Sequence, residues 1–274
     1  MRSQDLARRT AFRLLVLAYA LISAGSTAGA HDFWLQPSSL APEPGSTVAV
    51  GLRVGQNFEG DPVPRNDAKV RRFVLLDARG ETALAGEAGS EPAGSAPVGA
   101  AGIAVAGYMS VPTPIVLDAE KFEVYLKEEG LEHVVATRRD TGLTKEPGKE
   151  IYSRCAKAIL RVGGKGGRGA ERALGCGFEL IPETLPSSAQ GGTAVFKALS
   201  RGKPAQGIKV VALLQGSAAN PAEARTGSDG RVKLRLTGPG VWLVKAVEMN
   251  PAPVTSGADW ESIWASVVLE VGAR

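Results

Sequence analysis

The sequence predicts a mainly β protein with two β-sandwich domains and one short helical insertion near residues 119–137. Three observations support this prediction. Apolar and polar residues alternate in short runs, which is the pattern of half-buried strands. Clusters of Gly, Pro and Asp separate these runs at short intervals and indicate turns. A single segment, 119–129, instead carries apolar residues at helical spacing, so little helix is expected.

The helical insertion belongs to the N-terminal domain. Phe122, Tyr125 and Leu126 would form its apolar face, while Asp118 can cap its start and Gly130 its end. The other elements expected in this domain are strands at 47–54, 70–76, 103–109 and 152–162, a second helical turn at 131–137, and loops at 86–102 and 163–169.

A second domain is expected to begin near Pro186, which divides the chain into segments 31–185 and 186–274 after an N-terminal signal. Regularly spaced short strands with turns between them are typical of a β-sandwich. Trp242 and Trp264 are predicted to lie in its core, because burial is the usual role of Trp. Its expected strands are 193–199, 208–214, 223–226, 232–236, 241–247 and 263–271.

Residues 1–30 have the three parts of a secretory signal peptide. Four arginines give a positive start, and the apolar run at 14–22 is too short to span a bilayer as a stable helix. The small residues Ala28, Gly29 and Ala30 then form a cleavage site. We therefore expect a periplasmic or secreted protein with no membrane span after cleavage, exported by either the general or the twin-arginine route.

The charge balance of the mature chain argues against nucleic acid as a partner. The full chain has 32 Lys and Arg against 28 Asp and Glu. Removing residues 1–30 takes away four Arg and one Asp, which leaves 28 basic against 27 acidic residues. No basic run or aromatic-rich basic patch is present either.

Several other function classes lack their motifs. The Gly-rich stretch GGKGGRG at 163–169 has neither the spacing nor the following Ser or Thr of a phosphate loop. The chain contains no GxSxG and no HExxH motif, which removes the usual sequence signals of hydrolases.

The two cysteines, Cys155 and Cys176, leave two interpretations open. An exported chain with an even number of cysteines can pair them as a disulfide. A chain of this length can also fold with two free thiols. A metal-binding role is less favoured, because the two residues are not in a CxxC arrangement.

His31 is the best candidate for metal chemistry. Cleavage after Ala30 would make it the N-terminal residue, which offers a free amine and a ring nitrogen to one ion. The competing interpretation is that His31 follows the cleavage site by chance. Asp32 is the nearest carboxylate, whereas His133 lies among glutamates and is expected to be solvated. A copper brace also requires a second histidine, and the sequence does not show whether His133 can reach His31.

The segment HDFWLQP at 31–37 resembles a family of periplasmic proteins that carry domain of unknown function 4198, some of which are associated with nickel uptake. This resemblance implies an exported β-rich protein that handles a transition metal. The C-terminal part also resembles transthyretin-like or carboxypeptidase-regulatory-like sandwiches, through GxPxxGxxV at 202–210 and TGSDGRVKL at 226–234. Further matches to the family lie at 53–66, 119–132, 152–160, 178–186, 240–249 and 258–271.

Glu248 is a departure from this family, whose members carry His at the corresponding position. If that position belongs to a metal site, the resemblance implies His31, Asp32 and Glu248 as the ligand set for nickel or copper. A carboxylate is a harder ligand than imidazole, so selectivity for these metals would be weaker.

The sequence thus supports three functional hypotheses. The first is a non-enzymatic binding or accessory protein that handles nickel or copper through His31, with a metal-uptake or envelope protein as partner. The second is a mono-copper oxidative enzyme that uses the N-terminal histidine. The third is a structural β-sandwich protein without metal.

Overall fold

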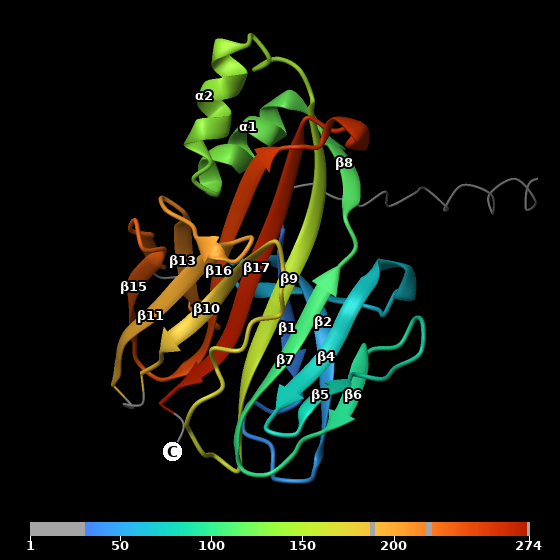
Figure 1. Ribbon diagram of the computed structural model, residues 1–274, viewed down its shortest axis with the longest axis vertical. Coiled ribbons are helices and arrows are strands. Elements are labelled where there is room, and N and C mark those ends of the chain that lie inside the picture. The colour runs from blue at the N-terminus through green and yellow to red at the C-terminus, as the bar shows by residue number, and fades with distance from the viewer. Residues whose placement is uncertain (1–30, 187–189, 218–220, 273–274) are drawn as a thin grey trace, which may run out of the picture.

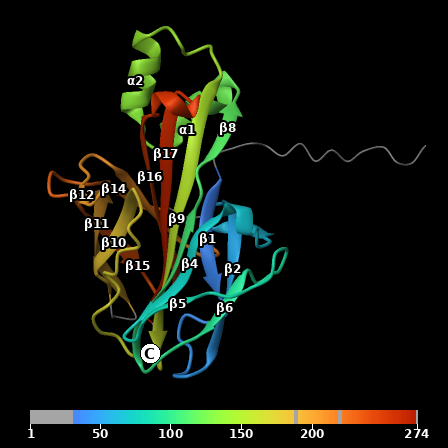
Figure 2. The same ribbon diagram turned by 45° about the vertical axis from the view of Figure 1, so that its right-hand side comes forward.

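The computed structural model describes residues 31–186, 190–217 and 221–272, and the predicted signal at 1–30 lies outside the described residues. Three β-sheets form three layers, with two helices at one end (Figures 1 and 2). In the part of the chain that the structure describes, no helix is both long and apolar enough to cross a membrane.

The middle layer is a nine-stranded sheet that contains strands from both halves of the chain. β9 (Gly148–Val162) and β17 (Trp260–Val271) are far apart in the sequence but are neighbours in this sheet. They pair in parallel, with Glu150 opposite Trp260. The strand order is β14 (Ala222–Arg225), β13 (Lys209–Leu214), β16 (Gly240–Pro251), β17 (Trp260–Val271), β9 (Gly148–Val162), β7 (Gly102–Ser110), β4 (Val70–Asp77) and β5 (Gly80–Ala83), with β8 (Thr113–Leu117) also paired to β9.

A four-stranded sheet covers each face of the middle sheet (Figure 2). The N-terminal cover consists of β1 (Asp32–Pro37), β2 (Thr47–Gln56), β3 (Glu59–Val63) and β6 (Gly94–Pro97). The C-terminal cover consists of β10 (Phe178–Thr184), β11 (Gly191–Ser200), β12 (Lys203–Pro204) and β15 (Arg231–Thr237).

The helices α1 (Ala119–Glu128) and α2 (Glu132–Asp140) close the end of the middle sheet above β16 and β17 (Figure 1). Phe122, Tyr125 and Leu126 are buried, as the helical spacing predicts. Gly130 connects the helices with φ +71°, a conformation that a side chain disfavours. Two short 3-10 helices lie at Asp67–Lys69 and Val254–Ser256.

Side-chain alternation along the middle strands divides the core. On β16, Trp242, Val244 and Ala246 pack toward the C-terminal cover, whereas Leu243 packs toward the N-terminal cover. Further along the same face as Leu243, Val247 packs under the helices. Because alternate residues point to opposite faces, one strand supports two cores.

The fold is mainly β, with sandwich packing and a short helical insertion, as predicted. The two sandwiches share their middle sheet, because each cover packs on one face of it. The expected boundary near Pro186 therefore does not separate two sheets: β16 and β17 follow it in sequence but belong to the same sheet as β9. The expected strands and both helical segments are present, but the predicted loop at 86–102 contains β6.

Trp264 is a correction to the predicted C-terminal core. Trp242 lies in that core, but Trp264 packs against the cluster under the helices. On β17, Trp264 points to the face opposite Ala265 and Val267, so the strand alternation directs it away from the C-terminal cover.

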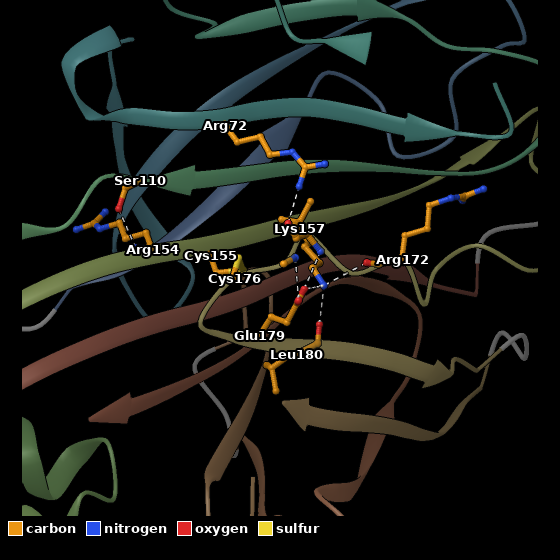
Figure 3. Close-up of a disulfide and its surroundings, with 11 residues drawn as sticks. Arg72, Ser110, Arg154, Cys155, Lys157, Arg172, Cys176, Glu179 and Leu180 are labelled. Atoms are coloured by element: carbon orange, nitrogen blue, oxygen red, sulfur yellow. Dashed lines mark hydrogen bonds and ion pairs between the residues drawn. A yellow bond between two sulfur atoms is a disulfide. The ribbon is translucent and has the colours of Figure 1, made fainter. Parts of the chain in front are cut away.

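Cys155 and Cys176 form a disulfide, which decides between the two interpretations of the sequence (Figure 3). It joins β9 to the segment that precedes β10 and closes a loop with a sequence separation of 21 residues. The bond therefore fastens the C-terminal cover to the middle sheet.

We expect the double variant C155A/C176A to lose about 3 kcal/mol of unfolding free energy. Without the bond, a loop of this length gains conformational entropy in the unfolded chain, which stabilises the unfolded state by about that amount. Urea unfolding followed by circular dichroism measures the difference. Equal stability of the variant and the oxidised parent would contradict this role.

Candidate functional site

The start of β1 is held firmly in the fold. Asp32 pairs with Gly55 across the sheet, and Phe33, Trp34 and Leu35 are buried. Trp34 packs edge-on against Phe58, with ring centroids 5.3 Å apart. The residues next to His31 are thus fixed by backbone pairing and by side-chain burial.

The β2–β3 hairpin supports this anchoring. Asn57 and Phe58 both have positive φ values, 54° and 62°, as a two-residue turn of this hand requires. A Cβ atom on Gly60 would lie 2.2 Å from the carbonyl oxygen of Val54 and 2.8 Å from Cη2 of Trp34, so glycine is required where β3 meets β2 and the Trp34 ring. The hairpin consequently encloses Trp34 and places Gln56 and Asn57 near Asp32.

Lys245 on β16 links the first strand to the helices. Its Nζ lies 2.6 Å from Oδ1 of Asp32 and 2.8 Å from Oε1 of Glu129. The side chains of Lys245, Asp32 and Glu129 are only 17%, 5% and 8% exposed, respectively. Below, these three residues are called the Lys245 triad.

The charges of the triad depend on one another. Burial alone would lower the pKa of Lys245, but the charges and hydrogen bonds of Asp32 and Glu129 outweigh it and raise that pKa, so the ammonium is retained. Burial, assisted by repulsion from Glu129, raises the pKa of Asp32 despite the opposing effect of Lys245. With both carboxylates ionised, the triad carries one net negative charge.

A hollow of about 290 Å³ opens beside the triad. Four carboxylates and two ammonium groups line it, so its net charge is negative when all are ionised. A cation is therefore the ligand that its electrostatics favour. The lining residues are Asp32, Gln56, Asn57, Glu128, Glu129, Lys209, Val211, Leu213, Pro221, Glu223 and Lys245.

A second polar group lies under α1, around Glu150 on β9. Its Oε1 accepts hydrogen bonds from the Tyr125 hydroxyl at 3.2 Å and from the Ser262 hydroxyl. Trp264 Nε1 in turn donates to Oγ of Ser262 at 3.2 Å. Within the described ranges no basic side chain pairs with Glu150, and burial raises the pKa of its carboxyl.

We expect E150Q to stabilise the protein at pH 7 and to lose this advantage toward pH 4. Burial raises the pKa of Glu150 in the folded protein above its ordinary value of 4.5. In the pH range between the unfolded-state and folded-state pKa values, the folded protein therefore binds a proton that the unfolded chain has lost. Glu150 therefore lowers stability as pH rises through that window. Urea unfolding of both proteins from pH 4 to pH 8 tests this, and a constant difference would contradict it.

The structure separates the residues that the sequence grouped as metal ligands. His31 is half-buried beside Asp32. Glu248 lies on the other face of β16 from Lys245, where its Oε2 accepts a hydrogen bond from Ser200 at 3.0 Å. Glu248 thus belongs to a different surface from Asp32, because residues 245 and 248 point to opposite sides of the strand.

His133 is exposed on α2, and its Nε2 lies 2.9 Å from the carbonyl oxygen of Met249. In the described part of the chain, the single cluster of three potential ligand residues is Cys155, Cys176 and Glu179, and neither histidine belongs to it. The sulfur atoms of that cluster are joined to each other, and Glu179 pairs with Lys157.

Lys245 and Glu129 were not identified from the sequence as site residues. One signal was available for Lys245: a lysine in the apolar strand VWLVKAV requires a buried partner or an edge position. Nothing in the sequence indicates that this partner is Asp32, more than 200 positions away.

The family model for the domain of unknown function DUF4198 matches residues 28–249. The chain belongs to this family. The matched segment of this DUF4198 chain runs from before β1 to near the end of β16, so it contains all three residues of the Lys245 triad. No curated protein shows significant similarity to the chain.

Three solved structures show distant similarity to this DUF4198 chain. The D0-D1 domain of Intimin is 14% identical, with a TM-score of 0.22, covering 87% of this chain and 97% of the other. The D00-D0 domain of Intimin is 12% identical, with a TM-score of 0.20 and coverages of 86% and 98%. A tetra-tandem repeat in the extending region of a large adhesion protein is 14% identical, with a TM-score of 0.22 and coverages of 89% and 50%. At such TM-scores no functional conclusion passes to this chain.

Proposed function

We propose that this protein is an exported, non-enzymatic binding protein that holds a divalent transition-metal ion, nickel or copper, through His31. Its partner would be a metal-uptake or envelope protein in the periplasm or outside the cell. The observation that supports the proposal is the anchoring of β1: the residue next to His31 is fixed by strand pairing and by the Lys245 triad.

Anchoring matters because metal affinity increases when the donor atoms are held in place before binding. Cleavage after Ala30 would leave the amine of His31 directly before a buried strand. The amine and a ring nitrogen would then be presented together beside a hollow whose net charge favours a cation.

The remaining donors are weaker than the sequence suggested. Oδ1 of Asp32 already contacts Lys245, so Asp32 can offer only its other carboxylate oxygen without breaking the triad. Glu248 is withdrawn from the ligand set, because it faces the opposite side of the sheet. His31 therefore has to provide most of the affinity, and the ion would keep positions open for water or for a ligand from a partner.

The mono-copper enzyme receives less support from the geometry. Such a site requires a second imidazole, and Nε2 of His133 is engaged with the carbonyl oxygen of Met249. A structural protein without metal remains the alternative that binding measurements test.

Calorimetric titration of nickel and copper into protein that starts at His31 tests the proposal, after mass spectrometry has established that terminus. We expect H31A to weaken binding at least tenfold and E248Q to leave it unchanged. Affinity should also fall as pH decreases, because the amine and the ring must lose protons to coordinate. Absence of binding, or equal binding by H31A, would favour the structural interpretation.

A further inference from the structure

Arg154 is a largely enclosed cation that has no anionic partner among the described residues. Its guanidinium carbon lies 4.5 Å from the ring centroid of Phe33 and 5.5 Å from that of Tyr152. The backbone N–H of Arg154 donates to Ser110, but among residues 31–186, 190–217 and 221–272 no carboxylate forms an ion pair with the side chain. Burial lowers the pKa of Arg154, against the opposing effects of Tyr152, Tyr108 and Asp32.

This arrangement differs from that of three other enclosed cations in the described chain. Lys245 has two carboxylates, Lys157 has Glu179, and Arg138 has Glu123. A guanidinium has five N–H donors and cannot lose its charge, so a partly desolvated arginine calls for an acceptor. The Phe33 and Tyr152 rings make favourable contacts with the charge of the guanidinium. Of the two side chains, only Tyr152 has an oxygen, its hydroxyl, that can accept a hydrogen bond from the guanidinium N–H groups.

The surroundings of Arg154 are aromatic and partly open. Trp264 lies opposite Arg154 in the register of β17 and β9, and its ring stacks on Tyr125 with centroids 5.3 Å apart. Tyr152 and Trp264 are both half-buried, so each retains some accessible ring surface. These rings offer flat apolar contacts on the same face of the middle sheet as the guanidinium.

We propose that Arg154, with Phe33, Tyr152 and Trp264, binds the carboxylate of a small organic acid that has a flat or apolar body. The planar fork of arginine matches a carboxylate in two parallel hydrogen bonds. The aromatic rings would contact the body of the ligand. This site is separate from the metal proposed at His31 and does not require it.

Charge considerations favour a monocarboxylate over phosphate. Arg154 is the single cation of this cluster, and Asp32 lies near enough for its charge to act on Arg154. Lys245 is committed to Asp32 and Glu129 and cannot assist. A dianion would therefore meet one positive group and a neighbouring negative one, whereas a single carboxylate charge is matched by Arg154 alone.

Benzoate is a suitable probe, and benzamide is its neutral control. Purified protein, freed of metal with a chelator, would be titrated with each compound by calorimetry and by tryptophan fluorescence. We expect benzoate to bind and to change the fluorescence, W264F to lose most of that change, and benzamide not to bind. R154M should weaken benzoate at least tenfold, the effect of losing a charge-assisted hydrogen-bonded pair. R201M, which removes an exposed arginine, should bind benzoate as the parent does.

R154M should reduce stability only slightly, because it removes the contacts of the guanidinium with two rings but breaks no ion pair among the described residues, and a urea unfolding curve checks this. The proposal is overturned if the parent does not bind benzoate, if R154M binds it equally well, or if inorganic phosphate binds more tightly than benzoate. Because metal is absent throughout, these outcomes are independent of whether His31 binds nickel or copper.

Discussion

Replacing Lys245 by Met should destabilise the protein by about 3–5 kcal/mol, which is the usual cost of removing one partner from a buried ion group. The variant leaves Asp32 and Glu129 facing each other with no cation between them. Either one carboxylate takes up a proton or the start of β1 moves away from β16. Urea unfolding at pH 7 measures the loss.

Lys209→Met is the matched control for this variant. Lys209 lines the same hollow, but it pairs with the exposed Glu223, and surface ion pairs contribute at most about 1 kcal/mol. Because burial already raises the pKa of Asp32 and its protonation would relieve the repulsion, the deficit of K245M should shrink as pH decreases. A loss no greater than that of K209M would show that the triad does not anchor β1.

Lys157→Met should produce a loss of similar size, about 3–5 kcal/mol, on the opposite face of the middle sheet. Nζ of Lys157 lies 2.6 Å from Oε2 of Glu179 and donates to the carbonyl oxygens of Arg172 and Leu180 (Figure 3). The side chains of Lys157 and Glu179 are almost fully buried. Without Lys157, a buried carboxylate keeps, within the described ranges, the backbone N–H groups of Leu174 and Gly175 as its donors.

Lys233→Met serves as the control for K157M, because Lys233 is an exposed lysine on β15. It should change the unfolding free energy by less than about 0.5 kcal/mol, as is usual at the surface. If K157M also remained within that range, the ion pair beside the disulfide would not be important for holding the C-terminal cover.

Local patterns predicted most of the strands and both helices. The alternation in 47–54 and 232–236 and the helical spacing around Phe122 are set by residues a few positions apart, and the structure confirms these elements. The shared middle sheet has no such local signal. It depends on the parallel pairing of β9 with β17, which are about a hundred residues apart. The sequence therefore indicated sandwiches but not their common sheet.

The candidate site was predicted only in part, for a related reason. His31 and Asp32 are adjacent in sequence, so their proximity was certain. The partner on β16 was assigned to Glu248 through family resemblance, whereas the structure places Lys245 against Asp32. Glu248 lies three residues after Lys245, and because side chains alternate along a strand, an odd separation places the two on opposite faces. The pairing of β16 with β13 and β17 fixes which of these faces meets β1.

We propose that an anchored His31, as the N-terminal residue, binds a divalent metal through its amine and its ring. The most direct test compares calorimetric titrations of nickel and copper into protein that starts at His31 and into the same protein with one added N-terminal alanine. The extension removes the chelating amine and leaves the ring and the Lys245 triad in place. We expect at least tenfold weaker binding by the extended form, whereas equal affinity of the two forms would rule out coordination by the amine.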